Sequence, residues 1–176
     1  SNRVVTLTEV QDSGGTANGG SDTATLSVAS TVSVTGVNDA PTLTATGSNP
    51  TFTEGGAAGS LFSGTSISTV EAGQTIEGLT LTVAGLVDGA SEILTLDGTA
   101  IGLSDGASGT TATNSLSYSV SVVGTTATLS LTGGTLSVGA AETLIDGASY
   151  QNNSQDPGTS NRVVTLTEVQ DSGGTA

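Results

Sequence analysis

Hydrophobic and polar residues alternate with a period of two along most of the chain. In residues 4–10, Val5 and Leu7 alternate with Thr6 and Thr8. This pattern is typical of antiparallel strands with one buried and one solvated face, and Thr has a high strand propensity. The same alternation predicts strands in five further segments: 24–36, 79–86, 92–98, 116–124 and 126–133.

Clusters of Gly, Ser, Asn and Asp separate these segments. Many short strands with such turns predict an all-β fold, an antiparallel β-sandwich. One segment departs from the period of two. Residues 137–150 place two alanines, Leu144 and Ile145 at helical spacing ahead of Gly147, which predicts one short helix near residues 140–147.

The chain repeats its own beginning, because residues 1–17 and 160–176 are identical. The period of this tandem repeat is 159 residues, a length that suits one whole domain per copy. Pro41 closes the segment VNDAP between two predicted strands, and its fixed φ favours a short, stiff linker.

These signals predict a chain of three parts. Residues 1–36 are the last two strands of one copy, and residues 37–41 are the linker. Residues 42–176 are the next β-sandwich repeat without its last strand. The sheet edge that such a cut leaves open is a template for strand pairing. We expect residues 24–35 of one copy to complete the sheet near residues 163–169 of another copy, head to tail, or to fold back within their own chain.

Composition narrows the function. Sixteen acidic residues against two Arg give a net charge of −14, which disfavours nucleic acid and anionic membranes as partners and favours cations. The chain has no His, Lys or Cys to act as base or nucleophile, and no Trp to support a sugar. We therefore expect a protein that is not an enzyme. No apolar run approaches a membrane span, so membrane insertion is not expected.

The Asp residues lie in predicted turns or at the ends of predicted elements. They are Asp12, Asp22, Asp39, Asp88, Asp97, Asp105, Asp146, Asp156 and Asp171. For any single Asp, hydrogen bonding to its own turn explains the position. Asp39, Asp12 and Glu54 are different, since three carboxylates that converge at a junction repel one another unless a cation lies between them. Ca²⁺ takes six to eight such oxygens.

The remaining charges are expected at the surface. Glu71, Glu77, Glu92 and Glu142 are predicted on solvated strand or helix faces. Arg3 and Arg162 are expected to form ordinary surface ion pairs with neighbouring carboxylates such as Glu9 and Glu168.

The junction VNDAP, the segment TFTEGGAA (51–58) and the late strand ending in TEVQDSGG resemble known tandem repeats. These are the cadherin-like and immunoglobulin-like repeats that form the extender regions of giant bacterial RTX-type surface adhesins. The resemblance implies a β-sandwich with Ca²⁺ bound at the domain junctions. The positions that match the metal ligands of the family are Glu54 on the first strand, Asp12 and Asp171 after the TEVQ strand, Asn38 and Asp39 in the linker, and Asp88 after the second strand.

By this resemblance the chain is expected to be a structural extender repeat, stiffened by Ca²⁺, that spaces an adhesive domain from the bacterial cell surface. Its expected location is therefore extracellular, and its expected partners are neighbouring copies of the same repeat. The alternative is a repeat that acts through its own surface, either by self-assembly into a filament or matrix or by binding a polysaccharide.

Overall fold

The computed structural model describes residues 1–174 and divides the chain into two units, residues 1–37 and residues 38–176. The boundary falls inside the VNDAP segment, between Val37 and Asn38. No helix within residues 1–174 has the length and apolar character that a membrane span requires.

The first unit is a β-hairpin. β1 (Asn2–Gln11) pairs antiparallel with β2 (Thr23–Ser33), and the connecting loop holds a short 3-10 turn, η1 (Ala17–Gly19). Eight of its large apolar side chains are more than half exposed: Val4, Val5, Leu7, Val10, Val28, Val32, Val34 and Val37. The hairpin contains no second layer of its own to bury these side chains. An isolated two-stranded hairpin is marginally stable at best in water.

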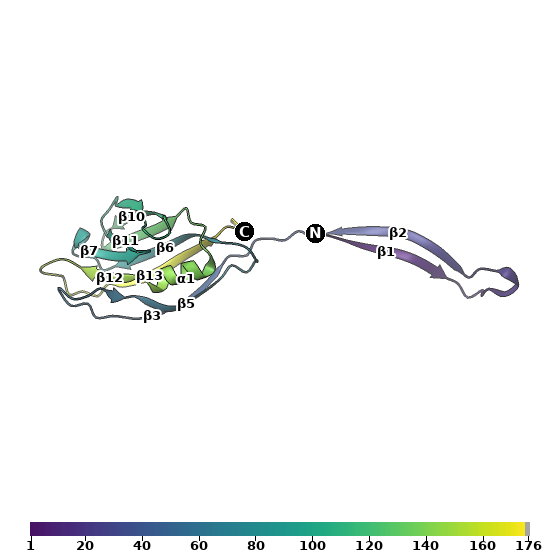
Figure 1. The fold of residues 1–176 in the computed structure, drawn as a ribbon, viewed down its shortest axis with the longest axis horizontal. Helices are drawn as coiled ribbons and strands as arrows, with labels where there is room; N and C mark the ends of the chain where they lie inside the picture. Colours follow the sequence, from purple (N-terminus) through teal and green to yellow (C-terminus); the bar gives the residue numbers. More distant parts are fainter. Residues whose placement is uncertain (175–176) are drawn as a thin grey trace. The chain divides into compact units, whose positions relative to one another are not determined.

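The second unit contains three antiparallel sheets (Figure 1). The five-stranded sheet has the order β13-β6-β11-β10-β9. Its strands are β6 (Ile76–Ala84), β9 (Ser108–Thr110), β10 (Ser117–Val123), β11 (Thr126–Thr132) and β13 (Val163–Asp171). The four-stranded sheet has the order β4-β12-β7-β8, with β4 (Gly59–Ser60), β7 (Glu92–Leu96), β8 (Thr99–Gly102) and β12 (Ser149–Asn152). A two-stranded sheet pairs β3 (Thr42–Gly47) with β5 (Phe62–Ser68).

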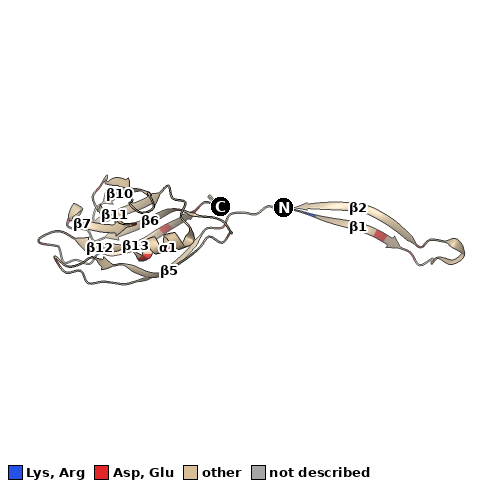
Figure 2. Ribbon diagram, viewed as in Figure 1, with Lys and Arg blue, Asp and Glu red and all other residues tan. Residues whose placement is uncertain are grey.

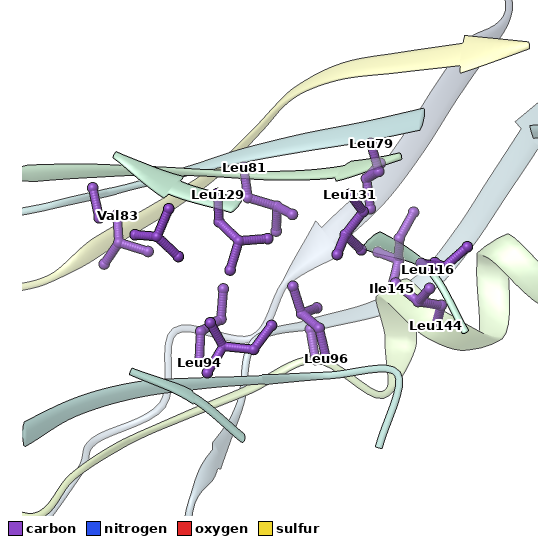
Figure 3. Packing of buried hydrophobic residues seen from close by; sticks show 14 of the residues in the cluster. Leu79, Leu81, Val83, Leu94, Leu96, Leu116, Leu129, Leu131, Leu144 and Ile145 are labelled. Atoms are coloured by element: carbon purple, nitrogen blue, oxygen red, sulfur yellow. The ribbon is translucent and has the colours of Figure 1, made fainter. Parts of the chain in front are cut away.

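The core lies between the five-stranded and four-stranded sheets. Leu81 and Leu129 are opposite each other on β6 and β11, and both are fully buried. Leu94 and Leu96 reach toward them from β7 in the facing layer (Figure 3). Buried and less buried residues alternate along β6, β7 and β11, as the period of two requires. The predicted all-β, antiparallel sandwich is therefore confirmed.

The predicted helix is also confirmed, as α1 (Val138–Asp146). Its N-cap is Ser137, whose hydroxyl accepts from the N–H of Ala140. The helix packs beside β5, where Glu142 accepts from the N–H of Ile67 at 2.9 Å and Asp146 accepts from the N–H of Thr65 at 3.1 Å. The prediction that Glu142 lies on a solvated face is therefore wrong, since this carboxylate caps a strand edge.

Acidic residues are sparse on the regular elements. Figure 2 marks them on β1, α1 and β13, which carry Glu9, Glu142 and Glu168 among others. Nine of the sixteen acidic residues fall outside the strands and the α-helix: Asp12, Asp22, Asp39, Glu54, Glu71, Asp88, Asp97, Asp105 and Asp156. The loops and element ends therefore carry most of the candidate chemistry.

Candidate functional site

One group of polar residues gathers where the linker enters the second unit. We call it the junction cluster and define it as Asn38, Asp39, Glu71, Gln74 and Asp171. The first two precede β3, the next two lie in the loop between β5 and β6, and Asp171 ends β13. Three segments far apart in the sequence therefore meet at this end of the sheets.

Hydrogen bonds hold the junction cluster together. The side chain of Asn38 donates to the carbonyl of Gly174 at 2.9 Å, and its Oδ1 lies 2.6 Å from Nε2 of Gln74. If the amide of Gln74 is turned over, its nitrogen donates to Asp171 Oδ2 and to the carbonyl of Thr69, both at 3.0 Å. Asn38 and Asp171 thus both lie within hydrogen-bonding distance of the Gln74 amide, whose nitrogen donates to one or the other according to its orientation.

The carboxylate of Glu71 has an incomplete set of hydrogen bonds. Its Oε1 accepts from the backbone N–H of Asp39 at 3.1 Å. Its Oε2 is buried and has no hydrogen-bond partner among the described residues. A buried carboxylate oxygen without a partner is costly. Glu71 was predicted on a solvated face, and the structure corrects this, because the side chain turns toward the linker.

The chemistry of the cluster suits a hard cation. Asp39, Glu71 and Asp171 provide carboxylates, Asn38 provides an amide oxygen, and the adjoining turn provides main-chain carbonyls. These are the oxygens that Ca²⁺ prefers. Within residues 1–174, however, no three acidic side chains converge closely enough to hold a metal ion on carboxylates alone. A cation here would need amide and main-chain oxygens, or oxygens from a neighbouring copy.

Asp171 and Asp12 occupy the same place in the two copies of the sequence and form the same local turn. Asp171 accepts from the N–H of Gly173 at 3.0 Å, and Asp12 accepts from the N–H of Gly14 at 2.8 Å. This is the turn that Asp favours through its own side chain. Asp171 is buried in the junction cluster, whereas Asp12 is exposed in the hairpin.

The other predicted metal ligands lie elsewhere. Glu54 is not on a strand but exposed in the turn that follows β3, and the six residues of β3 separate that turn from the linker by about 20 Å. Asp12 belongs to the hairpin unit. Asp88 lies in the loop between β6 and β7 and takes part in a different cluster. Of the six predicted ligands, Asn38 and Asp171 both lie against Gln74, and Asp39 contacts Glu71 through its backbone N–H.

The second polar group surrounds Arg162, and we call it the arginine cluster: Asp88, Glu92, Tyr150, Asn152 and Arg162. Nε of Arg162 donates to Glu92 Oε2 at 2.9 Å, and one terminal nitrogen donates to Asp88 Oδ2 at 2.8 Å. The other terminal nitrogen donates to the carbonyls of Gly158 and Ser160. The guanidinium thus ties the start of β13 to β7 and to the loop before β7.

Glu92 is the centre of this cluster and has no exposed surface. The N–H groups of Val87 and Asp88 both donate to it at 2.8 Å, and the hydroxyl of Tyr150 donates at 2.7 Å. Burial alone would raise the pKa of Glu92, but the hydrogen bonds from Arg162, from these N–H groups and from Tyr150 together lower it. Burial, and then the hydrogen bond to Glu92, raise the pKa of Tyr150.

Two predictions about the arginine cluster are wrong. Arg162 forms no ordinary surface pair with Glu168, because its side chain is 7% exposed and bound to Asp88 and Glu92. Glu92 is buried rather than solvated. The alternation along β7 could have predicted this burial. Glu92, Leu94 and Leu96 are two residues apart on the strand, so their side chains lie on the same, buried face.

Comparison of the chain with protein-family models, with curated proteins and with solved structures finds no match. The function proposed for this chain therefore rests on its own geometry, on its repeated sequence and on the resemblance carried by its junction segments.

Proposed function

We propose that this chain is a non-catalytic extender repeat of a large, secreted bacterial surface adhesin. In this role each copy adds length between the cell and an adhesive domain, and Ca²⁺ at the junction cluster stiffens the joint between copies. The observation that carries the calcium part is the buried, unpartnered Oε2 of Glu71 beside the linker residue Asp39.

The placement of the two clusters supports the role of a spacer. β13 begins at the arginine cluster and ends at the junction cluster, so its nine residues separate the two by about 30 Å. The linker enters the unit at the junction cluster, because Asn38 is bonded to Gly174 just beyond β13. Together with the period of 159 residues, this arrangement fits one elongated sandwich per copy.

Ca²⁺ would act through charge and geometry. Asp39, Glu71, Asp171 and Asn38 are the residues that would hold it, with main-chain carbonyls of the turn after β13. Arg162 is the only basic residue of the second unit by sequence, and it is bound in the arginine cluster. The junction cluster contains no basic side chain to reduce the repulsion between its carboxylates. A divalent ion would reduce that repulsion and would fix the linker to the sheets.

Thermal unfolding with Ca²⁺ and with EDTA tests this proposal. An ion at a hundred times its Kd adds about 2.7 kcal/mol, and each kcal/mol moves the Tm by about 2–8 °C for domains of this size range. We expect Ca²⁺ to raise the Tm by several degrees and Asp39→Ala to remove most of that rise. Asp156→Ala is the matched control, since it removes an exposed charge outside the cluster. The calcium site would be refuted by a Tm that is the same in Ca²⁺ and in EDTA, or by an equal loss of the Ca²⁺-dependent rise in Asp39→Ala and Asp156→Ala.

A second candidate function, self-assembly through the surface of the repeat, is favoured by one observation. Within residues 1–174, β13 pairs with β6 on one side and with no strand on the other. An edge of this kind is a template for a further strand. Assembly of copies would then proceed by strand pairing at β13.

A further inference from the structure

The two copies of the repeated sequence have different partners. β13 pairs with β6, whereas the identical residues in β1 pair with β2. We call the side of β13 that faces away from β6 its open edge, because no strand among residues 1–174 pairs there. Whether β2 fits this open edge depends on which backbone groups each strand presents.

The hydrogen bonds of the hairpin show which residues of β1 face β2. The N–H of Ser1 donates to the carbonyl of Val34 at 2.9 Å, and the N–H of Val34 donates back at 3.1 Å. In an antiparallel pair, such hydrogen-bonded positions recur every second residue. Val5 and Leu7 therefore direct their backbone N–H and C=O groups toward β2, where they face Ser30 and Val28.

The register of the large sheet shows which residues of β13 face its open edge. The two-residue turn between Val123 and Thr126 makes these two a hydrogen-bonded pair. Successive residues of a strand direct their backbone groups to opposite neighbours, so Thr126 and Thr128 of β11 face β10, and Ala127 and Leu129 face β6. On β6, Leu81 and Val83 therefore face β11, and Thr82 faces β13, where it forms a hydrogen-bonded pair with Thr165. The neighbouring residues Val164 and Leu166 therefore direct their backbone groups away from β6.

The edge that β1 uses toward β2 is the edge that is open on β13, because Val164 and Leu166 are the copies of Val5 and Leu7. The side chains also agree, because directly paired residues lie on the same face of a sheet. Val28, opposite Leu7, would continue the core face of Leu166, with Ser30 and Val32 on the same face. Ala29, Thr31 and Ser33 would lie on the outer face.

We propose that β2 of a second copy of this repeat pairs with the open edge of β13 in the register of the hairpin and becomes the sixth strand of the large sheet. The predicted pairs are Arg162 with Val32, Val164 with Ser30 and Leu166 with Val28. In a tandem array the second copy is the next repeat of the same polypeptide, and for separate chains of this length it is another molecule. The inference goes beyond the extender role and does not depend on Ca²⁺.

The β2 strand of the same chain cannot reach this position. In the proposed register Ser33 lies opposite Asn161, at the start of β13, while Asn38 is bonded to Gly174 beyond the other end. Residues 161 and 170 are about 30 Å apart along an extended strand. Five residues from Ser33 to Asn38 span at most about 18 Å. The donor must therefore come from another copy.

The donor strand and the open edge are different surfaces of one chain. Pairing between separate chains is therefore head to tail, and such heterologous contacts extend into open filaments unless the rotation closes a ring. β2 exchanges one partner for an identical sequence, so it keeps its backbone hydrogen bonds. It gains a packed layer beneath Val28 and Val32, which are 58% and 52% exposed in the hairpin.

Engineered disulfides test the register, since the chain has no Cys of its own. Thr165 and Ala29 would form a non-hydrogen-bonded pair, as Thr6 and Ala29 do in the hairpin, with Cα atoms about 4.5 Å apart and within disulfide range. We would mix Thr165→Cys chains with Ala29→Cys chains, refold them together and oxidise them. The donor chain also carries Val5→Pro, which removes one N–H that β1 gives to β2.

The expected result is a covalent dimer in this mixture and its loss when Ser33→Cys, four residues out of register on the same face, replaces Ala29→Cys. One chain with both Thr165→Cys and Ala29→Cys should give a ladder of multimers on a non-reducing gel. Equal dimer yields in matched and out-of-register mixtures, or an intrachain disulfide in the double variant, would overturn the proposal. Repeating the experiment in EDTA distinguishes the strand pairing from the calcium site, since cross-linking should persist without Ca²⁺.

Discussion

Nε of Arg162 donates to Oε2 of Glu92 at 2.9 Å, and the two side chains are 7% and 0% exposed. The same Arg of the repeated sequence, Arg3, is exposed in the hairpin and donates to Ser1 and Asn2 nearby. One sequence thus places its single Arg in two environments. The difference lies in the partner strands, because β13 pairs with β6 in the large sheet whereas β1 pairs with β2 in the hairpin.

This contrast predicts unequal effects of the same substitution. Arg162→Ala leaves the buried carboxylate of Glu92 without its partner, and breaking a buried ion pair in this way costs about 3–5 kcal/mol. Arg3→Ala removes an exposed side chain and should change the free energy of unfolding by less than about 0.5 kcal/mol. Urea unfolding of the two variants measures both. Similar losses for Arg3→Ala and Arg162→Ala would contradict the role of the arginine cluster.

Acid should weaken the fold through Glu92. Its pKa in the folded chain lies below the ordinary value of 4.5, so the unfolded chain takes up the proton first as the pH falls. The stabilisation is complete above that ordinary value and declines as the pH falls through the folded pKa. Glu92→Gln should be less stable at pH 7 and should lose stability less steeply below about pH 4.5. Parallel stability curves for the two proteins would show that Glu92 does not contribute.

Alkali should weaken the fold through Tyr150, with the opposite sign. The pKa of this hydroxyl is raised above its ordinary value of 10.0 by burial and by its bond to Glu92. Its stabilisation is complete below 10.0 and is lost as the pH rises toward the folded pKa. Above about pH 10, Tyr150→Phe should therefore lose stability less steeply than the parent chain. The free energy of unfolding from urea titrations at several pH values measures this, and equal slopes would refute it.

The period of two predicted many of the strands, because a long alternating segment can bury all its hydrophobic residues on one face only as a β-strand. β6, β7, β10 and β11 overlap the predicted segments, and α1 overlaps its predicted segment. The alternation missed β3, β4, β5, β8, β9 and β12. β5 shows why, since Gly64 has a positive φ and the pairing with β3 shifts register nearby, so its pattern is broken. The strands β4, β8, β9 and β12 are too short for an alternation of hydrophobic and polar residues to be recognised, since they have at most four residues each.

The candidate site was predicted less completely. Asn38, Asp39 and Asp171 were predicted from the resemblance to calcium-binding repeats; Asn38 and Asp171 both lie against Gln74, and Asp39 contacts Glu71 through its backbone N–H. Glu71 and Glu92 could not be assigned in the same way, because a single Glu in a sequence does not show which tertiary neighbour it faces. The alternation of β7 would have placed Glu92 on the buried face, since it lies two and four residues before Leu94 and Leu96. The partner of Glu92, Arg162, is 70 residues away and depends on the topology of the sheets.

The extender role is tested most directly by the length of multi-copy chains. Small-angle X-ray scattering of proteins with two, three and four periods, each in Ca²⁺ and in EDTA, gives the maximum dimension of each. The extender role predicts a constant increment per period in Ca²⁺ and smaller, less regular increments in EDTA, because the junctions then bend. Dimensions that do not grow in proportion to the number of copies in Ca²⁺, or that are identical in EDTA, would contradict it.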